Sequence, residues 1–207
     1  MANDEHVRRA IKQLHALKRQ GKPMRLAADL WRKRWQTLVA IILSARTRDE
    51  VTIVVGESLF AKYPSLDELA HAKLSALERV IHPVNFFRNK SNSVRACARE
   101  LIERHSGRVP SSVDELVELS GVGRKTANVY LAQYGASAIG VDTHVTYISR
   151  ALAWTRHRAP VKIERDLEKL FPKHMWRRVN SICVHFGKTH MSRRKKDVLL
   201  ADISSSI

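Results

Sequence analysis

The sequence predicts an all-α protein, and three observations support this fold class. No stretch alternates apolar and polar residues for long enough to indicate a sheet. Apolar residues recur instead at helical spacing, as in a first helix whose buried face carries Val7, Ala10, Ile11, Leu14 and Leu17. Glycine, proline and short polar capping residues then divide the chain into about ten short helices.

The later elements follow from the same signals. A helix over residues 35–45 is apolar nearly all round and should be central in a core. Ser65 and Ser112 each begin a capping box, which predicts a short helix after each serine. A basic tail, residues 192–196, should follow the last helix, and residues 204–206 should fray. The remaining helices are expected near 50–63, 74–80, 94–102, 125–134, 142–153, 160–171 and 173–186.

Composition points to an anionic partner. The 207 residues include 37 Lys and Arg against 20 Asp and Glu, a formal net charge of +17. Such an excess destabilises a compact chain by self-repulsion, so it indicates a polyanion, with nucleic acid expected first and an anionic membrane surface second. A general basic bias of the surface is the remaining alternative.

The same composition excludes two classes of protein. Cys97 and Cys183 are too few for a disulfide framework and suit a reducing compartment. The longest apolar run, residues 38–43, is too short to cross a bilayer, and the N-terminal residues do not resemble a signal peptide. We therefore expect an intracellular protein, in the cytoplasm and nucleoid if the source is prokaryotic, without a membrane partner.

The segment from Leu119 to Ala127 joins two predicted helices through a turn that contains Gly121 and Gly123. Glycine allows positive φ and a close approach of the backbone. The free N–H groups and the dipole at the start of the second helix make an anion site, and a phosphodiester is its natural ligand. Packing of a helix corner would explain the two glycines equally well.

Together with Val141-Asp142-Thr143-His144, this segment resembles the helix–hairpin–helix DNA glycosylase superfamily, and most closely its endonuclease III branch. Residues 38–49 resemble the early helix and DNA-probing loop of that branch, and residues 86–91 resemble its second intercalating loop. The resemblance covers roughly residues 26–186. It implies two helical subdomains with a DNA-binding cleft between them. Residues 25–134 would form a six-helix domain with the hairpin at about 113–134, and residues 1–24 plus 135–207 the second.

The resemblance also implies the chemistry. Lys125 would attack the sugar C1′, form a Schiff base and promote β-elimination, provided that a desolvated, electropositive site lowers the pKa of its amine. Asp142 would stabilise the oxocarbenium-like sugar. The simpler alternatives are a phosphate-contacting lysine and a helix N-cap aspartate.

DNA contacts are expected from the hairpin, from the loops near residues 46 and 86, and from His144, the last residue of the Val141-Asp142-Thr143-His144 motif. Arg46 stands where the family commonly places a glutamine, and Phe86 stands where it places an apolar wedge. For Phe86 and Phe87, core packing is the alternative. The predicted substrate is double-stranded DNA that contains a damaged, oxidised pyrimidine or an abasic site, bound by a monomer. The expected DNA-binding residues are Gly121, Val122, Gly123, Arg124, Arg46, Phe86, Arg88, Lys90 and His144.

One departure concerns metal. Typical endonuclease III relatives carry four cysteines that hold a [4Fe–4S] cluster after the last helix. The matching region of this chain has one cysteine, Cys183, which lies inside the predicted last helix, before the expected ligands. The sequence therefore predicts no cluster and no metal site. Cys183, His185 and His190 could offer zinc ligands, but their spacing fits no tight pattern. A monovalent cation at the hairpin is compatible with the sequence.

Two other functions stay open. A monofunctional glycosylase for mismatched or alkylated bases is one, although Ala40 stands where adenine-removing relatives carry a glutamate. A non-catalytic helix–hairpin–helix protein that binds DNA is the other. The presence of both Lys125 and Asp142 argues against it, because phosphate binding needs no such aspartate.

Overall fold

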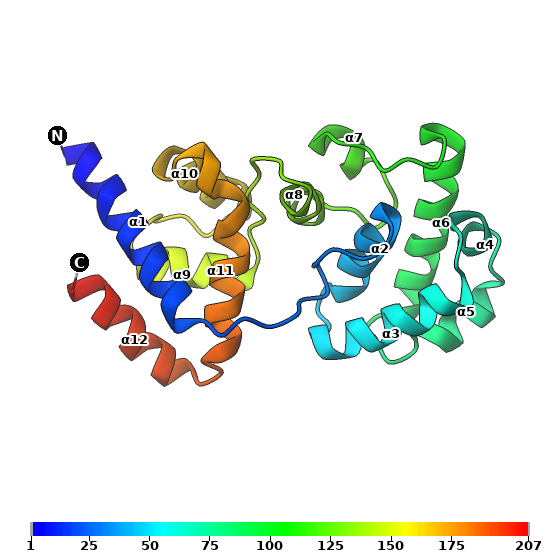
Figure 1. Cartoon of the computed structure of the whole chain (residues 1–207), viewed down its shortest axis with the longest axis horizontal. Helices are drawn as coiled ribbons and strands as arrows, with labels where there is room; N and C mark the ends of the chain where they lie inside the picture. Colours follow the sequence, from blue (N-terminus) through cyan, green and yellow to red (C-terminus); the bar gives the residue numbers. More distant parts are fainter. Residues whose placement is uncertain (1, 207) are drawn as a thin grey trace. The chain divides into compact units, whose positions relative to one another are not determined.

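The computed structural model describes residues 2–206, and side chains from Asp4 to Ser206. Within this range the protein consists of α-helices and one short 3-10 helix, without a strand, which confirms the all-α prediction (Figure 1). The helices are α1 (Ala2–Gln20), α2 (Arg34–Ser44), α3 (Asp49–Lys62), α4 (Leu66–Ala70), α5 (Leu74–Ile81), α6 (Phe87–His105), α7 (Val113–Val117), α8 (Arg124–Gln133), α9 (Thr143–Ala151), α10 (Pro160–Leu170), η1 (Lys173–Met175), α11 (Trp176–Thr189) and α12 (Arg193–Ser205).

The chain divides into two compact units. The middle unit is Arg25–Gln133, and the terminal unit combines Met1–Met24 with Tyr134–Ile207. Each unit has its own core and is described by itself below. No helix within residues 2–206 combines the length and the apolar character that a bilayer crossing requires.

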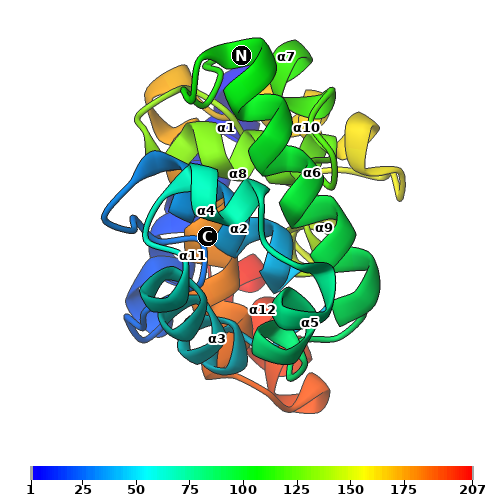
Figure 2. The ribbon, with the colours of Figure 1, turned by 90° about the vertical axis from the view of Figure 1, so that its right-hand side faces the viewer.

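Helix α2 is the centre of the middle unit. It is buried without interruption from Trp35 to Leu43, as its uniformly apolar sequence predicts, and it packs against α3, α6 and α8. Helix α6 in turn packs against the short helices α4 and α5 (Figure 2). The short helices α4 and α5 begin after Ser65 and Lys73, where the sequence predicts two separate short helices.

The structure confirms the two predicted helix starts, each with its serine as N-cap, and each serine hydroxyl also donates to the carboxylate of the glutamate three residues later. The backbone N–H of Glu68 donates to Ser65 Oγ at 3.1 Å, and that of Glu115 donates to Ser112 Oγ at 3.3 Å. Each cap satisfies a backbone donor that has no partner inside the first turn of a helix. Local hydrogen bonding therefore explains where α4 and α7 begin.

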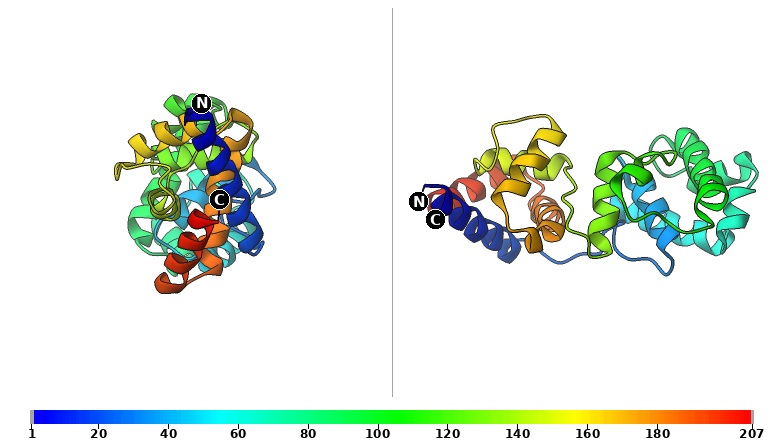
Figure 3. Two further views of the ribbon diagram at one scale, coloured as in Figure 1. Left: turned by 90° about the vertical axis from the view of Figure 1, so that its left-hand side faces the viewer. Right: turned by 90° about the horizontal axis from the view of Figure 1, so that it is seen from above.

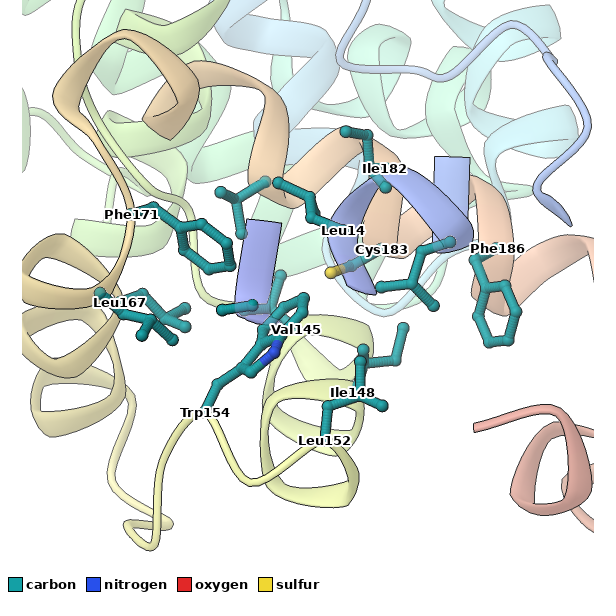
Figure 4. Close-up of a cluster of buried hydrophobic side chains, with 14 of the residues drawn as sticks. Leu14, Val145, Ile148, Leu152, Trp154, Leu167, Phe171, Ile182, Cys183 and Phe186 are labelled. Carbon is teal, nitrogen blue, oxygen red and sulfur yellow. The ribbon is translucent and has the colours of Figure 1, made fainter. Parts of the chain in front are cut away.

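The terminal unit is built around apolar side chains from α1, α9, α10 and α11 (Figure 4). Trp154 packs edge-on against Phe171, with ring centroids 4.9 Å apart, and its indole N–H donates to Gln13 Oε1 at 2.7 Å. Figure 4 shows Cys183 among these side chains, and the cysteine is fully buried. The first and last segments of the chain thus share one core, and α1 packs against both α11 and α12 (Figure 3).

The tail prediction is wrong, because residues 193–205 form α12. Ser192 caps this helix, and Leu200 and Ile203 are buried against the terminal core. Arg9 of α1 donates to the carbonyl of Ser204 at 2.5 Å, which holds the end of the helix. The spacing of Leu200 and Ile203, three residues apart, is the sequence signal for this helix, and the basic residues at its start resemble an unstructured tail.

Candidate functional site

The helix–hairpin–helix segment is α7, a turn and α8 in the middle unit. Glu100 of α6 anchors its turn, because the Glu100 carboxylate accepts from the backbone N–H and the hydroxyl of Ser120 at 2.7 and 2.6 Å. Gly121 follows with φ +80°, a conformation that favours glycine. A Cβ at Gly121 would lie 2.8 Å from Ser93 Cβ, whereas a Cβ at Gly123 would meet open space. Packing explains Gly121, but it does not explain Gly123.

The turn presents backbone rather than side chains. Gly121 and Gly123 are exposed, while the side chain of Val122 is buried. Any contact of Val122 with DNA would therefore use its backbone. A turn of this kind, followed by a helix start, offers N–H groups to a phosphate.

Lys125 lies in the first turn of α8 and is half-buried, next to the exposed Arg124. The following residues, from Thr126 to Leu131, are buried and fix α8 in the middle unit. Lys125 therefore stands where a rigid, buried helix meets solvent at the hairpin. A group in this position is held by the scaffold, as a reactive side chain requires.

Asp142 belongs to the terminal unit and is half-buried. It is the N-cap of α9, because its Oδ1 accepts from the backbone N–H of Val145 at 2.8 Å. Asn180 of α11 supports the preceding segment, since its side-chain amide donates to the carbonyl of Gly140 at 2.8 Å. Asp142 therefore acts as an N-cap, the alternative role considered above. The capping hydrogen bond also fixes the orientation of the Asp142 carboxylate.

His144 is half-buried, and its ring lies so close to α11 that a Cβ at Gly187 would clash with it. It therefore has a packing role in the terminal unit.

The pKa of the Cys183 thiol is raised well above its usual value, chiefly by burial and further by the Asp142 carboxylate.

The two loops expected to probe DNA are close neighbours in the middle unit. Arg46 and Phe86 are both exposed, and the Arg46 guanidinium lies over the Phe86 ring, 4.6 Å from its centroid. Arg88 is exposed and lies 5.0 Å from the centroid of the Phe87 ring. Phe87 is half-buried beside the exposed ring of His82, with ring centroids 4.7 Å apart, so it is less exposed than Phe86 but does not belong to the buried core.

The expectation that Lys90 contacts DNA is corrected by the structure. Lys90 is 7% exposed, and its ammonium donates to the carbonyls of Leu43 and Ala45 and to Thr47 Oγ1. Burial lowers the pKa of Lys90 to about 8. Basic residues that follow one another in sequence suggest a DNA contact. In α6, however, Arg88 and Lys90 lie on different faces of the helix, and the face of Lys90 is buried.

Sequence reasoning also missed three polar residues that support the site, namely Glu100, Asn180 and Asn85. Each acts on a backbone or side-chain group at least 20 positions away in the chain. No local pattern marks such a partner, because the pairing depends on which helices come together.

Comparison with known proteins agrees with this geometry. Residues 39–173 match the sequence profile described as "HhH-GPD superfamily base excision DNA repair protein". The chain belongs to this superfamily. It is also 41% identical to endonuclease III of Synechocystis sp. over 162 residues, which are 77% of this chain and 74% of the relative. Endonuclease III of Thermotoga maritima is 41% identical over 155 residues, 74% of this chain and 73% of the relative.

Solved structures place the chain in the endonuclease III branch of the superfamily. A non-covalent endonuclease III–DNA complex superposes with a TM-score of 0.82 at 30% identity, covering 92% of this chain and 88% of that one. A trapped endonuclease III–DNA covalent intermediate superposes with a TM-score of 0.76 at 34% identity, covering 80% and 79%. The resemblance inferred from the hairpin is therefore confirmed.

The iron–sulfur cluster typical of this branch does not fit the residues of this endonuclease III relative. Its two cysteines lie in different units, and both are buried. Burial also raises the pKa of both thiols, that of Cys97 to about 12. His185 and His190 each bind a backbone carbonyl, those of Met24 and Gln20. Over the described residues, no group of three or more possible ligand side chains could hold a metal ion.

Proposed function

We propose that this endonuclease III relative is a base-excision repair enzyme that removes a damaged base from double-stranded DNA and then cleaves the strand as an abasic-site lyase. One observation carries the proposal: an amine at Lys125 directly follows a glycine turn with exposed backbone, in a chain of this family. The excess of basic residues supports a DNA substrate. Oxidised pyrimidines are the proposed lesions, and the enzyme would act inside the cell where the DNA is, in the cytoplasm and nucleoid if the source is prokaryotic.

Lys125 is the proposed nucleophile. Its neutral Nζ attacks C1′ while the N-glycosidic bond breaks, and that electron pair leaves with the base, which takes up a proton. The bound amine gives up a proton, O4′ takes one up, and the C1′–O4′ bond breaks as the nitrogen lone pair forms a protonated Schiff base between C1′ and Nζ. This cation acidifies the C2′ hydrogen. Removal of the C2′ proton forms the C2′=C3′ bond and expels the 3′ phosphate, after which water hydrolyses the imine.

Asp142 is the proposed electrostatic partner of the sugar. A carboxylate stabilises the positive charge that develops at C1′ as the base departs. Its capping bond to Val145 supports this role, because a fixed carboxylate needs no reorganisation during the reaction. The proposal requires Lys125 and Asp142, which belong to different units, to act on the same nucleotide.

The target base must leave the helix before C1′ can be attacked, and the gap must be filled. We assign the filling to Arg46 and Phe86, which are exposed and carry a planar cation and an aromatic ring. The backbone of Gly121, Val122 and Gly123 is the proposed phosphate contact. Arg124 and Arg88 are exposed and add positive charge beside the hairpin and the second loop.

Borohydride trapping tests the proposal. Duplex DNA with an abasic site is incubated with the protein and borohydride, which reduces a Schiff base to a stable covalent adduct. We expect an adduct from the wild type and none from Lys125→Ala. Lys73→Ala is the matched control, since Lys73 is an exposed lysine of the same unit that makes no capping bond.

The outcome also separates the alternatives. On a second duplex that carries a damaged base, release of the base without an adduct would identify a monofunctional glycosylase. DNA binding without base release or an adduct would identify a non-catalytic binding protein. Either result would refute the assignment of Lys125 as the nucleophile.

A further inference from the structure

Two loops of the middle unit carry strained residues side by side. The first loop, residues 45–48, contains Arg46 at φ +56°, and the second, residues 82–86, contains Phe86 at φ +60°. Side chains rarely adopt this left-handed backbone conformation, and it persists only where the surroundings determine it. The contacts that hold the two loops must therefore be strong enough to maintain both positive-φ residues.

Asn85 ties the second loop to the first. Its backbone N–H donates to Thr47 Oγ1 at 3.1 Å, and its side-chain amide donates to the carbonyl of Arg46. Both bonds cross between the loops: one ends at Arg46, which has a positive φ, and the other at Thr47 beside it, while the donor Asn85 directly precedes Phe86. The conformation of Arg46 thus depends on the position of the residue before Phe86.

Lys90 joins the same loops from inside the unit. It reaches from α6 to the end of α2, where Nζ donates to the carbonyls of Leu43 and Ala45 at 2.7 and 2.6 Å. Its third bond, at 3.0 Å, goes to Thr47 Oγ1, which also accepts from Asn85. Burying an ammonium is costly unless its donors are satisfied, and here the carbonyls at a helix C-terminus and one hydroxyl satisfy them.

The outer side of this arrangement is the stacked pair. The Arg46 guanidinium lies over the Phe86 ring, and Phe86 as a residue is 51% exposed. A guanidinium plane stacks on aromatic rings and on bases alike. An exposed aromatic ring held by a strained backbone and covered by an arginine is poorly explained by core packing.

We propose that Arg46 and Phe86 enter the DNA as one preassembled wedge, and that Lys90 is the positioning residue that locks the two loops into this wedge. The inference rests on the proposed glycosylase function and adds how the gap left by the flipped nucleotide is filled. A preassembled pair loses less side-chain entropy on binding than two separate probes would. Lys90 contributes through the backbone at Leu43, Ala45 and Thr47, without touching the DNA.

The test compares two abasic substrates. Duplex abasic DNA must be opened and filled, whereas single-stranded abasic DNA has no opposite strand to unstack. We expect Lys90→Met to slow borohydride trapping on the duplex roughly tenfold, the equivalent of one lost charge-assisted hydrogen bond. Trapping on the single strand should stay near the wild-type rate. Lys73→Met is the control, because it removes an exposed lysine of the same unit.

Fluorescence reports the wedge directly. A 2-aminopurine placed opposite a tetrahydrofuran abasic analogue brightens when it is unstacked, and Lys90→Met should reduce that signal. Thr47→Val is the second variant: it removes the oxygen shared by Lys90 and Asn85 with little change in shape. It should have the same selective effect even if Lys90→Met does not fold.

A double-mutant cycle tests the pairing. If Arg46 and Phe86 act as one wedge, Arg46→Ala/Phe86→Ala loses no more fluorescence than Phe86→Ala alone. Losses that multiply would identify two independent probes and overturn the pairing. Equal slowing on both substrates, or none in Lys90→Met and Thr47→Val, would overturn the role of Lys90. No adduct from the wild type on either substrate would instead refute the proposed function.

Discussion

Replacing Gly121 with alanine tests how the hairpin turn is built. The new Cβ would lie 2.8 Å from Ser93 Cβ and 3.3 Å from Ile42 Cγ2, at φ +80°. A positive φ costs a residue with a Cβ about 1–2 kcal/mol. Forcing a methyl group into a packed site costs about 1–3 kcal/mol more. The free energy of unfolding should therefore fall by about 2–5 kcal/mol, a large part of the roughly 5–15 kcal/mol typical of a folded domain.

Gly123→Ala is the matched control in the same turn. Gly123 has no positive φ, and a Cβ there would meet nothing within 4 Å. Gly123→Ala should therefore lower the free energy of unfolding by less than about 1 kcal/mol, the scale of a helix-cap substitution. Urea unfolding followed by circular dichroism gives the free energies of wild type and both variants.

A second cycle separates strain from crowding. Ser93→Gly removes the Cβ that the new methyl group would meet, at a cost of about 1 kcal/mol in helix α6. In the double variant with Gly121→Ala, the loss of unfolding free energy that is due to crowding should disappear, which gives a coupling energy of about 1–3 kcal/mol. The loss that is due to the positive φ should remain. Equal losses from Gly121→Ala and Gly123→Ala, or no coupling to Ser93, would refute the reasoning.

Three further predictions concern charge and metal. Asp142→Asn keeps the capping acceptor but removes the charge, so turnover should fall while DNA affinity stays near wild type; Asp142→Ala should also lose about 1 kcal/mol of stability. Unchanged turnover in Asp142→Asn would leave only the capping role. The purified protein should be colourless and contain no stoichiometric iron by metal analysis, because two cysteines cannot bind a four-thiolate cluster; stoichiometric iron would contradict this. The stability of wild type relative to Lys90→Met should rise between pH 8 and 10.5, measured by urea unfolding at several pH values. In that window folded Lys90 has released its proton and unfolded Lys90 still holds it, so the gain approaches about 3 kcal/mol. A difference that does not change with pH would show that burial of Lys90 has no such cost.

Local chemistry explains why much of the fold could be predicted. The caps at Ser65, Ser112 and Asp142 act within one turn of a helix, so the residues that decide them are adjacent in sequence. The uniformly apolar stretch of α2 likewise predicts its central position, because it has no polar face to turn toward solvent. The hairpin turn and the positions of Lys125 and Asp142 at the starts of helices follow from the same kind of signal.

Burial and long-range pairing explain what the sequence did not predict. In sequence, Lys90 belongs to the same aromatic and basic run as Arg88, yet the turn of α6 leaves Arg88 exposed and directs Lys90 to the end of α2. The basic residues at the start of α12 suggested a free tail, but Leu200 and Ile203 secure that helix to the terminal core.

The sequence by itself determined the helices before α12, the caps at Ser65, Ser112 and Asp142, the hairpin turn and the candidate catalytic residues, because these depend on neighbours within a few positions. Only the tertiary structure decided that Arg46 stacks on Phe86 and that Lys90 supports both loops from inside. The physical reason is that a buried ammonium is tolerated only where several acceptors converge. That convergence exists only after α2 and α6 have packed together.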